Sequence, residues 1–279
     1  MSRDFDGAII VVTGASTGLG RAIAVETASR GAKAVVVDYA SSAKEAEETC
    51  DLVRAHGAEA IAVQGDVGDD AACRAIAARA QGFGRIDALF NNAGTTKFAA
   101  HGDMELVTDE DFLRIYRINV VGGFQMVRAA RALLEATEQA SAVVNTSSIA
   151  GVAGIGSSIP YAASKGALNT MTISLARALA PKIRVNAICP GFIDTPWFGK
   201  GVGAAAQAAV RDRAAASTPL KAASTAEDIA GAAVFLAGED ASYLTGSCIY
   251  VDGGVLVQQR SPEVETFPLD AYPKVGRLA

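Results

Sequence analysis

Short runs of apolar residues alternate with longer helical patterns along nearly the whole chain, and this alternation constrains the fold more than any other feature. Seven runs are expected to form strands, at residues 8–13, 34–38, 60–64, 88–91, 142–147, 184–189 and 247–251. They show little polar alternation, which is typical of strands covered on both faces. Helices are expected at residues 18–30, 43–55, 70–81, 109–135, 161–180 and 226–236. We therefore predict an α/β fold with one doubly wound parallel sheet and helices on both faces.

The composition narrows the class of protein. The chain has 279 residues, of which 50% are hydrophobic, enough for a large buried core. Its net charge of −5, without a cluster of lysine and arginine, argues against nucleic acid or an anionic membrane as a partner. The polar N-terminus is no signal peptide, and no apolar run approaches the roughly 20 residues of a membrane span. The four cysteines lack clustered spacing and predict reduced thiols in the cytoplasm, and no metal site is predicted.

Three glycines, Gly14, Gly18 and Gly20, lie between the first expected strand and the first expected helix. Glycines let the backbone turn sharply and approach a pyrophosphate, and a helix N-terminus supplies N–H donors and the positive end of a dipole. We therefore predict a Rossmann-type dinucleotide site at this turn. The alternative is a plain strand-to-helix turn, because glycine triplets alone are weak evidence.

Asp38 ends the second expected strand. A carboxylate there can accept both ribose hydroxyls of an adenosine and would repel a 2′-phosphate, which favours NAD over NADP. No lysine or arginine lies within the glycine turn to bind such a phosphate. The alternative is an aspartate that only terminates the strand.

Tyr161 and Lys165 are four residues apart, so they share one face of the helix expected at 161–180. Tyrosine has a solution pKa of about 10, too high for proton transfer at neutral pH. The ammonium of Lys165, together with a positive nicotinamide ring, would lower that pKa. Ser148 can donate a hydrogen bond to a substrate oxygen while Tyr161 gives or takes its proton. These residues predict hydride transfer between a nicotinamide cofactor and a secondary alcohol or ketone.

In this order the motifs resemble the short-chain dehydrogenase/reductase family over residues 8–254. The likeness rests on the turn 13–20, Asp66-Val67, Asn91-Asn92-Ala93-Gly94, Asn119, Ser148, Tyr161 with Lys165, and Pro190-Gly191 followed by Thr195. The resemblance implies that Asn119, Ser148, Tyr161 and Lys165 are catalytic, with Asn119 holding a water that relays protons from Lys165. It implies cofactor contacts at Gly14, Ser16, Thr17, Gly18, Leu19, Gly20, Asp38, Asp66, Val67, Asn92, Ala93, Gly94, Tyr161, Lys165, Pro190, Gly191, Ile193 and Thr195. Family members are commonly dimers or tetramers, so a homodimer or homotetramer is expected.

The sequence departs from the family after the second expected strand. Tyr39-Ala40-Ser41-Ser42 resembles NADP-using members, in which such a stretch follows an asparagine. If Ala34 is an insertion relative to the family, Asp38 shifts by one position. NADP is then the alternative cofactor.

The residues expected around the substrate are mainly apolar. They are Phe98, Ile149, Val152, Ile155, Phe192, Trp197 and Phe198. This composition favours an alicyclic, aromatic or acyl small-molecule substrate over a free sugar. One alternative is an NADP-dependent 3-oxoacyl reductase. Another is a binding protein that senses the cofactor without turnover, against which the intact catalytic set argues.

Residues 1–254 are expected to form the dinucleotide-binding and catalytic domain. The family usually ends soon after a motif like 251–254, whereas here residues 255–279 follow. This extension is too apolar for a solvated tail, so we expect it to be ordered over a substrate pocket, its own or a neighbouring subunit's. The alternative is a frayed terminus. The long segment 192–219 is expected to be a functional or mobile connection.

Overall fold

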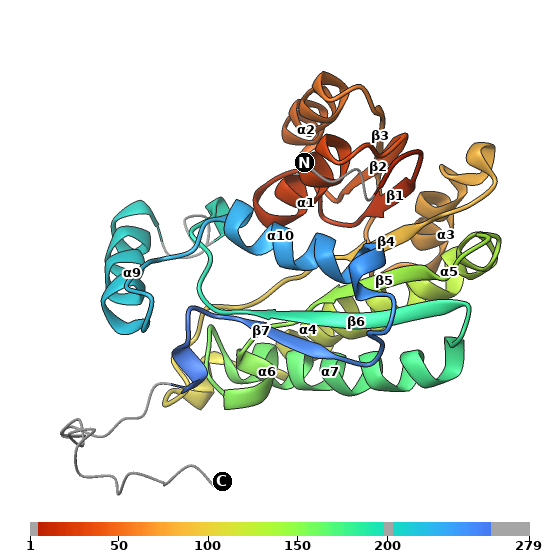
Figure 1. Ribbon diagram of the computed structural model, residues 1–279. Coiled ribbons are helices and arrows are strands. Elements are labelled where there is room, and N and C mark those ends of the chain that lie inside the picture. The colour runs from red at the N-terminus through yellow and green to blue at the C-terminus, as the bar shows by residue number, and fades with distance from the viewer. Residues whose placement is uncertain (1–4, 198–202, 258–279) are drawn as a thin grey trace, which may run out of the picture.

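The computed structural model of the protein describes residues 5–197 and 203–257 (Figure 1). Its strands are β1 (Ile9–Val12), β2 (Ala34–Tyr39), β3 (Glu59–Gln64), β4 (Ala88–Asn91), β5 (Ser141–Thr146), β6 (Ile183–Pro190) and β7 (Cys248–Val251). All pair in parallel in the order β3-β2-β1-β4-β5-β6-β7. The order reverses between β1 and β4, which confirms the doubly wound sheet predicted from the sequence.

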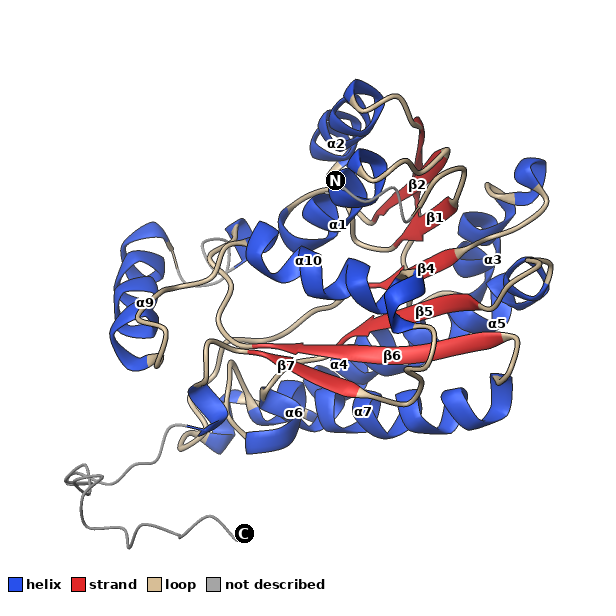
Figure 2. Cartoon of the chain, viewed as in Figure 1, coloured by secondary structure: helices blue, strands red, loops and turns tan. Residues whose placement is uncertain are grey.

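Helices cover both faces of the sheet (Figure 2). They are α1 (Gly18–Ser29), α2 (Ala43–Ala55), α3 (Asp70–Ala78), α4 (Asp109–Tyr116), α5 (Gly123–Glu135), α6 (Ala150–Ala153), α7 (Ile159–Leu179), α9 (Ala204–Ser217) and α10 (Ala226–Ala237). Alternate strand residues supply two separate cores. Ile10 and Val12 pack with α1, α2 and α10, whereas Ile9 and Val11 pack with α3, α5 and α7. This is why β1, whose residues are all apolar, shows no alternation of polar and apolar positions.

The helix predicted at 109–135 is not a single α-helix. A π-helical segment, Arg117–Gly122, joins α4 to α5 and contains Asn119. Close packing accompanies it, because a Cβ on Gly122 would lie 2.8 Å from Cγ2 of Val67. Such segments are frequent at functional sites, and their extra residue leaves no trace in a 3.6-residue periodicity.

Segment 192–219 also holds more structure than expected. Its alanine-rich part forms α9, which Gln207 anchors by donating to the Asp194 carboxylate at 2.7 Å. Thr225 and Asp228 form a capping box at the start of α10. Most of the extension, residues 258–279, lies outside the described residues, so its predicted placement is untested. No described helix is long and apolar enough to cross a membrane.

Candidate active site

A cavity of about 1340 Å³ lies where the carboxyl ends of the central strands meet the glycine turn. Ser148 reaches it from the end of β5, and Pro190 from the end of β6. Tyr161 and Lys165 reach it from the first two turns of α7. In a doubly wound sheet this edge is where ligands bind.

The start of α7 determines where Tyr161 points. Ser158 is the N-cap residue, and its hydroxyl accepts a hydrogen bond from the Tyr161 backbone N–H at 3.4 Å. Pro160 occupies the first turn, where its missing N–H is not needed. The helix therefore starts two residues before the predicted position, and Tyr161 lies in its first turn.

Tyr161, Ser148 and Lys165 meet in the cavity, as the sequence predicted. The Ser148 hydroxyl hydrogen-bonds the Tyr161 hydroxyl. The Lys165 Nζ lies 5.5 Å from the centroid of the Tyr161 ring and donates to the backbone carbonyl of Thr146 at 2.7 Å. The Ser147 hydroxyl donates to the Lys165 carbonyl at 3.2 Å, which ties the serine segment to α7.

Burial dominates the electrostatics of this cluster. It raises the pKa of Tyr161 to about 12, and the hydrogen bond from Ser148 opposes that rise. Burial also lowers the pKa of Lys165 to about 8. Both groups are thus driven toward their neutral forms, which is typical of acid–base residues in a desolvated site. The protein alone does not lower the pKa of Tyr161, so the lowering expected from Lys165 is not visible without a bound cofactor.

Asn119 is buried beneath the catalytic pair, and its side chain contacts only protein groups. Its Oδ1 accepts from the Thr95 N–H at 2.7 Å. Its Nδ2 donates to the Thr95 carbonyl and to the Ser164 hydroxyl, both at 3.0 Å. The visible role of this side chain is to join the loop after β4 to α7. The proton relay implied by the resemblance is untested.

The glycine turn has the shape that a pyrophosphate needs. Gly14 has a positive φ of 62°, and a Cβ there would lie 2.9 Å from the Cα of Ala93. Asn92 Nδ2 holds the turn by donating to the carbonyls of Thr13 and Gly14, both at 3.1 Å. Thr17, the N-cap of α1, makes no side-chain capping bond, and no acidic residue lies in the first turn. The helix N–H groups therefore remain available to an anion.

The predicted cofactor residues divide into two groups. Those that line the cavity are Gly14, Thr17, Gly18, Leu19, Asn92, Ala93, Gly94, Tyr161, Lys165, Pro190, Gly191, Ile193 and Thr195. Thr195 lies directly over the turn, 3.4 Å from the position of a Cβ on Gly18. Ser16, Gly20, Asp38, Asp66 and Val67 do not line the cavity.

Asp38 lies inside β2 and beneath the turn rather than at its surface. It is 1% exposed, and its Oδ2 accepts from the Gly14 N–H at 3.1 Å. Its Oδ1 has no hydrogen-bond partner among the described residues. Burial raises the pKa of this carboxyl to about 7, and the charge of Asp66 adds to the rise. The contact with Gly14 ties Asp38 to the turn, and the ribose contact expected from the sequence stays a prediction.

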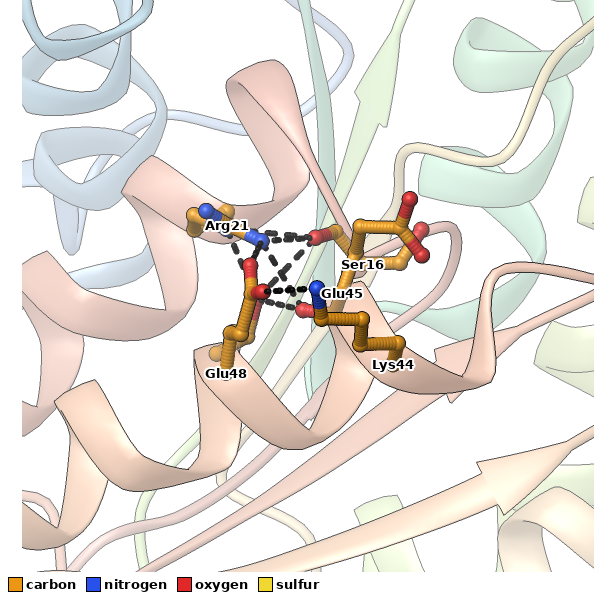
Figure 3. A network of polar contacts seen from close by, with 6 residues as sticks. Ser16, Arg21, Lys44, Glu45 and Glu48 are labelled. Carbon is orange, nitrogen blue, oxygen red and sulfur yellow. Dashed lines mark hydrogen bonds and ion pairs between the residues drawn. The ribbon is translucent and has the colours of Figure 1, made fainter.

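The basic side chains beside the turn are paired (Figure 3). Arg21 donates to the Ser16 carbonyl at 2.8 Å and to the Glu48 carboxylate at 3.2 Å. Lys44 lies 4.0 Å from Glu48 on the same helix. Arg21 also donates to the Glu45 carbonyl at 2.9 Å, so its side chain connects the glycine turn to α2.

The apolar side of the cavity agrees largely with the sequence. Phe98, Ile149, Ile155, Phe192 and Trp197 line it. Val152 does not, and Phe198 lies outside the described residues. Sequence reasoning missed the face of α9 that carries Val210, Arg213, Ala214 and Ser217. Their i, i+3, i+4, i+7 spacing was the signal that could have identified this face.

The chain is similar over most of its length to a reductase family model and to known oxidoreductases. A family model described as Enoyl-(Acyl carrier protein) reductase matches residues 14–256. An oxidoreductase of uncharacterised function from Methylorubrum extorquens is 40% identical over 90% of this chain and 98% of its own. An L-rhamnose 1-dehydrogenase (NAD(P)(+)) from a Sphingomonas strain is 36% identical over 90% of this chain and 97% of its own.

A solved structure shares the fold as well. It is a Burkholderia xenovorans protein assigned to the short-chain dehydrogenases/reductases, 40% identical to this chain, with a TM-score of 0.82. The match covers 90% of this chain and 98% of that one. The likeness therefore extends over the sheet, the glycine turn and the cavity together.

Proposed function

The chain belongs to the short-chain dehydrogenase/reductase family, and we propose that it interconverts a secondary alcohol and its ketone on a largely apolar substrate, with Tyr161 as the acid–base group. The family is one of oxidoreductases that act on CH–OH groups with NAD(P). The observation that carries the proposal is the meeting of Tyr161, Ser148 and Lys165 in one cavity with the glycine turn.

Each side chain has a distinct task in this proposal. Ser148 donates to the substrate oxygen and holds it beside the Tyr161 hydroxyl. Tyr161 protonates that oxygen in reduction and removes the alcohol proton in oxidation. Lys165 favours the tyrosinate form by its charge and binds the nicotinamide ribose. Asn119 positions α7 and supports proton exchange with solvent. A bound nicotinamide supplies or accepts the hydride.

The direct test replaces Tyr161 by phenylalanine, which deletes only the titrating hydroxyl. We expect kcat to fall roughly 10²- to 10⁴-fold while the affinity for NAD(P)H stays nearly unchanged. The assay is a panel of aryl, alicyclic and 3-oxoacyl ketones followed by nicotinamide absorbance. Tyr243→Phe is the control, because Tyr243 is fully exposed. More than a tenth of the wild-type kcat in Tyr161→Phe would remove Tyr161 from the chemistry.

We propose NAD as the preferred cofactor. Asp66 and, above its pKa of about 7, Asp38 add negative charge close to the glycine turn, and Glu48 already pairs with Arg21 and Lys44. A 2′-phosphate would therefore meet carboxylates and paired cations. We expect kcat/KM with NAD to exceed that with NADP roughly 5- to 150-fold. Equal values would instead favour phosphate binding by the stretch Tyr39–Ser42.

A second candidate is an NADP-dependent 3-oxoacyl reductase. The description of the matching family model, which refers to acyl carrier protein, favours an acyl substrate. A 3-oxoacyl thioester assayed with NADPH against simple ketones with NADH separates the two candidates. A binding protein without turnover is set aside, because the relatives are named as oxidoreductases and dehydrogenases.

We further propose a cytoplasmic homodimer or homotetramer. Apolar side chains are exposed on α4, on α5 and in the turn before α4, among them Met104, Leu113 and Phe124. Such a patch is typical of a surface that pairs with another subunit. Light scattering after gel filtration measures the mass directly, and a monomer at micromolar concentration would contradict this part of the proposal.

A further inference from the structure

The part of the cavity beside Tyr161 is shaped for an apolar group. The ring centroid of Trp197 lies 5.4 Å from that of Phe98 and 6.0 Å from that of Tyr161. Ile155 lines the same space. A substrate carbon skeleton that reaches Tyr161 would therefore pack between aromatic rings.

Helix α9 presents a different character to the same cavity. Val210, Arg213, Ala214 and Ser217 line it, spaced as one helix face. The helix is held in place near its start, since Gln207 Nε2 donates to Asp194 at 2.7 Å and to the Thr195 carbonyl at 3.3 Å. Arg213 is thus the charged member of a face that is otherwise small or apolar.

The other charged residues that line the cavity already have partners. Lys165 donates to the Thr146 carbonyl. Asp228 belongs to the capping box of α10, and Asp252 accepts from the N–H groups of Gly254 and Leu256. Within residues 5–197 and 203–257, Arg213 has neither a hydrogen bond nor an ion pair. An unpaired guanidinium at the edge of an apolar cavity matches an anion with two adjacent oxygens, such as a carboxylate or a phosphate, to which it can donate two parallel hydrogen bonds.

We propose that Arg213 selects the substrate by binding an anionic group, a carboxylate or a phosphate, that lies away from the reacting carbon. The apolar skeleton then occupies the space between Phe98 and Trp197, and the carbinol or carbonyl carbon lies at Tyr161. This inference rests on the proposed function, and it narrows the substrate class to anionic ketones and alcohols.

The test uses Trp197, the single tryptophan of the chain, as a built-in fluorescent probe of the cavity. The full-length protein, free and saturated with NAD⁺, is titrated with octanoate, octyl phosphate and the uncharged octanamide. We expect one of the two anions to bind roughly 10- to 100-fold more tightly than octanamide at low ionic strength. The tighter of the two identifies the group, and added salt should reduce its advantage.

Two variants of the same helix locate the effect. Arg213→Met keeps the length of the side chain and should remove the preference for the anion. Arg211→Met is the matched control, because Arg211 does not line the cavity and pairs with Asp212 at 3.2 Å. It should keep the preference. A preference that survives in Arg213→Met, or equal binding of octanoate, octyl phosphate and octanamide to the wild type, would overturn the proposal.

The remaining outcomes also separate the alternatives. If Arg213→Met weakens NAD⁺ binding without changing the preference for an anion, Arg213 binds the phosphates of the cofactor instead. Because the titration needs no turnover, it also works in Tyr161→Phe, where the preference should persist. The titration can therefore be interpreted even if Tyr161 is not the acid–base group. Conversely, an absent preference for the anion would not affect the assignment of Tyr161.

Discussion

Two buried cations at opposite ends of the sheet differ in how fully their hydrogen-bonding capacity is used. Arg184, near the start of β6, is 7% exposed and donates to five backbone carbonyls. Two of these carbonyls lie in the last turn of α10, and three lie in the segment that follows it. Lys165, at the carboxyl end of the sheet, is 4% exposed and, within the described part of the chain, donates only to the Thr146 carbonyl. The two terminal nitrogens of Arg184 therefore have five acceptors between them, whereas the Lys165 ammonium has one.

The difference indicates a structural role for Arg184 and a functional role for Lys165. The Arg184 guanidinium stabilises the fold, because the carbonyls of Leu236 and Ala237 have no other donor among the described residues. An ammonium with one protein acceptor lies in a site that destabilises its charged form, and its remaining donors face a cavity that can hold a ligand. Residues that carry function often reduce stability in this way. Removing each cation should therefore move stability in opposite directions.

The largest effect on stability is expected from Arg184→Met. The variant leaves the carbonyls of Leu236 and Ala237 without a donor. It also removes one of two donors from the carbonyls of residues 238, 241 and 244. We expect the free energy of unfolding to fall by about 3–5 kcal/mol. Urea denaturation followed by circular dichroism measures it. The control Arg74→Met removes an exposed pair with Asp70 and should change stability by less than about 1 kcal/mol. A loss in Arg184→Met no larger than that of the control would show that water replaces the guanidinium.

Lys165→Met should instead stabilise the protein near neutral pH. The folded state holds this group at a pKa of about 8 against a reference value of 10.5, so the burial penalty corresponds to at most about 3 kcal/mol. Leaving the Thr146 carbonyl without its donor offsets part of the gain, and we expect a net increase of about 1–2 kcal/mol.

The difference in unfolding free energy between Lys165→Met and the wild type should depend on pH. Between pH 8 and 10.5 the unfolded chain binds more protons at this group than the folded protein does, so wild-type stability rises with pH across that window. The advantage of the variant should therefore be full below pH 8 and shrink toward pH 10.5. Cofactor binding should weaken at the same time, and any residual activity should show a higher apparent pKa. A pH-independent difference in stability would contradict a buried neutral lysine.

Sequence patterns were most informative where local chemistry decides the structure. The run that became β1 is apolar at every position because helices cover both faces, and β2 is apolar as far as Val37. The two strands pair from Ile9↔Ala34 to Val12↔Val37. The spacing of Tyr161 and Lys165 placed both on one helix face. The capping box at Thr225 could be predicted because its two partners are three residues apart.

Features set by distant contacts could not be predicted. The π-helical segment around Asn119 coincides with the packing of Gly122 against Val67, which are far apart in the chain. The role of Arg184 depends on carbonyls that lie more than fifty residues later. The position of Asp38 at the end of an expected strand indicated that it lies near the glycine turn. It did not indicate that its carboxylate is buried and accepts a hydrogen bond from the Gly14 N–H.

The smallest effect on stability is expected from Asp38→Asn, which tests a second incompletely satisfied group at the functional end of the sheet. Burial raises the pKa of this carboxyl from 3.8 to about 7, so the folded protein binds more protons at this group than the unfolded chain between those values. Wild-type stability should therefore fall as pH rises from about 4 to 7. The asparagine removes this fall but leaves a buried amide donor without an acceptor, so we expect a net gain of about 1 kcal/mol above pH 7.

Two measurements on Asp38→Asn separate its structural and functional effects. Urea unfolding at pH 5 and pH 8 should show a gap over the wild type that grows with pH, whereas the exposed control Asp51→Asn should show no such growth. The ratio of kcat/KM for NAD over NADP should also narrow, because negative charge close to the glycine turn is removed. If stability changes as expected and the cofactor ratio does not, Asp38 supports the turn through Gly14 alone, and cofactor choice belongs to residues at the surface of the turn.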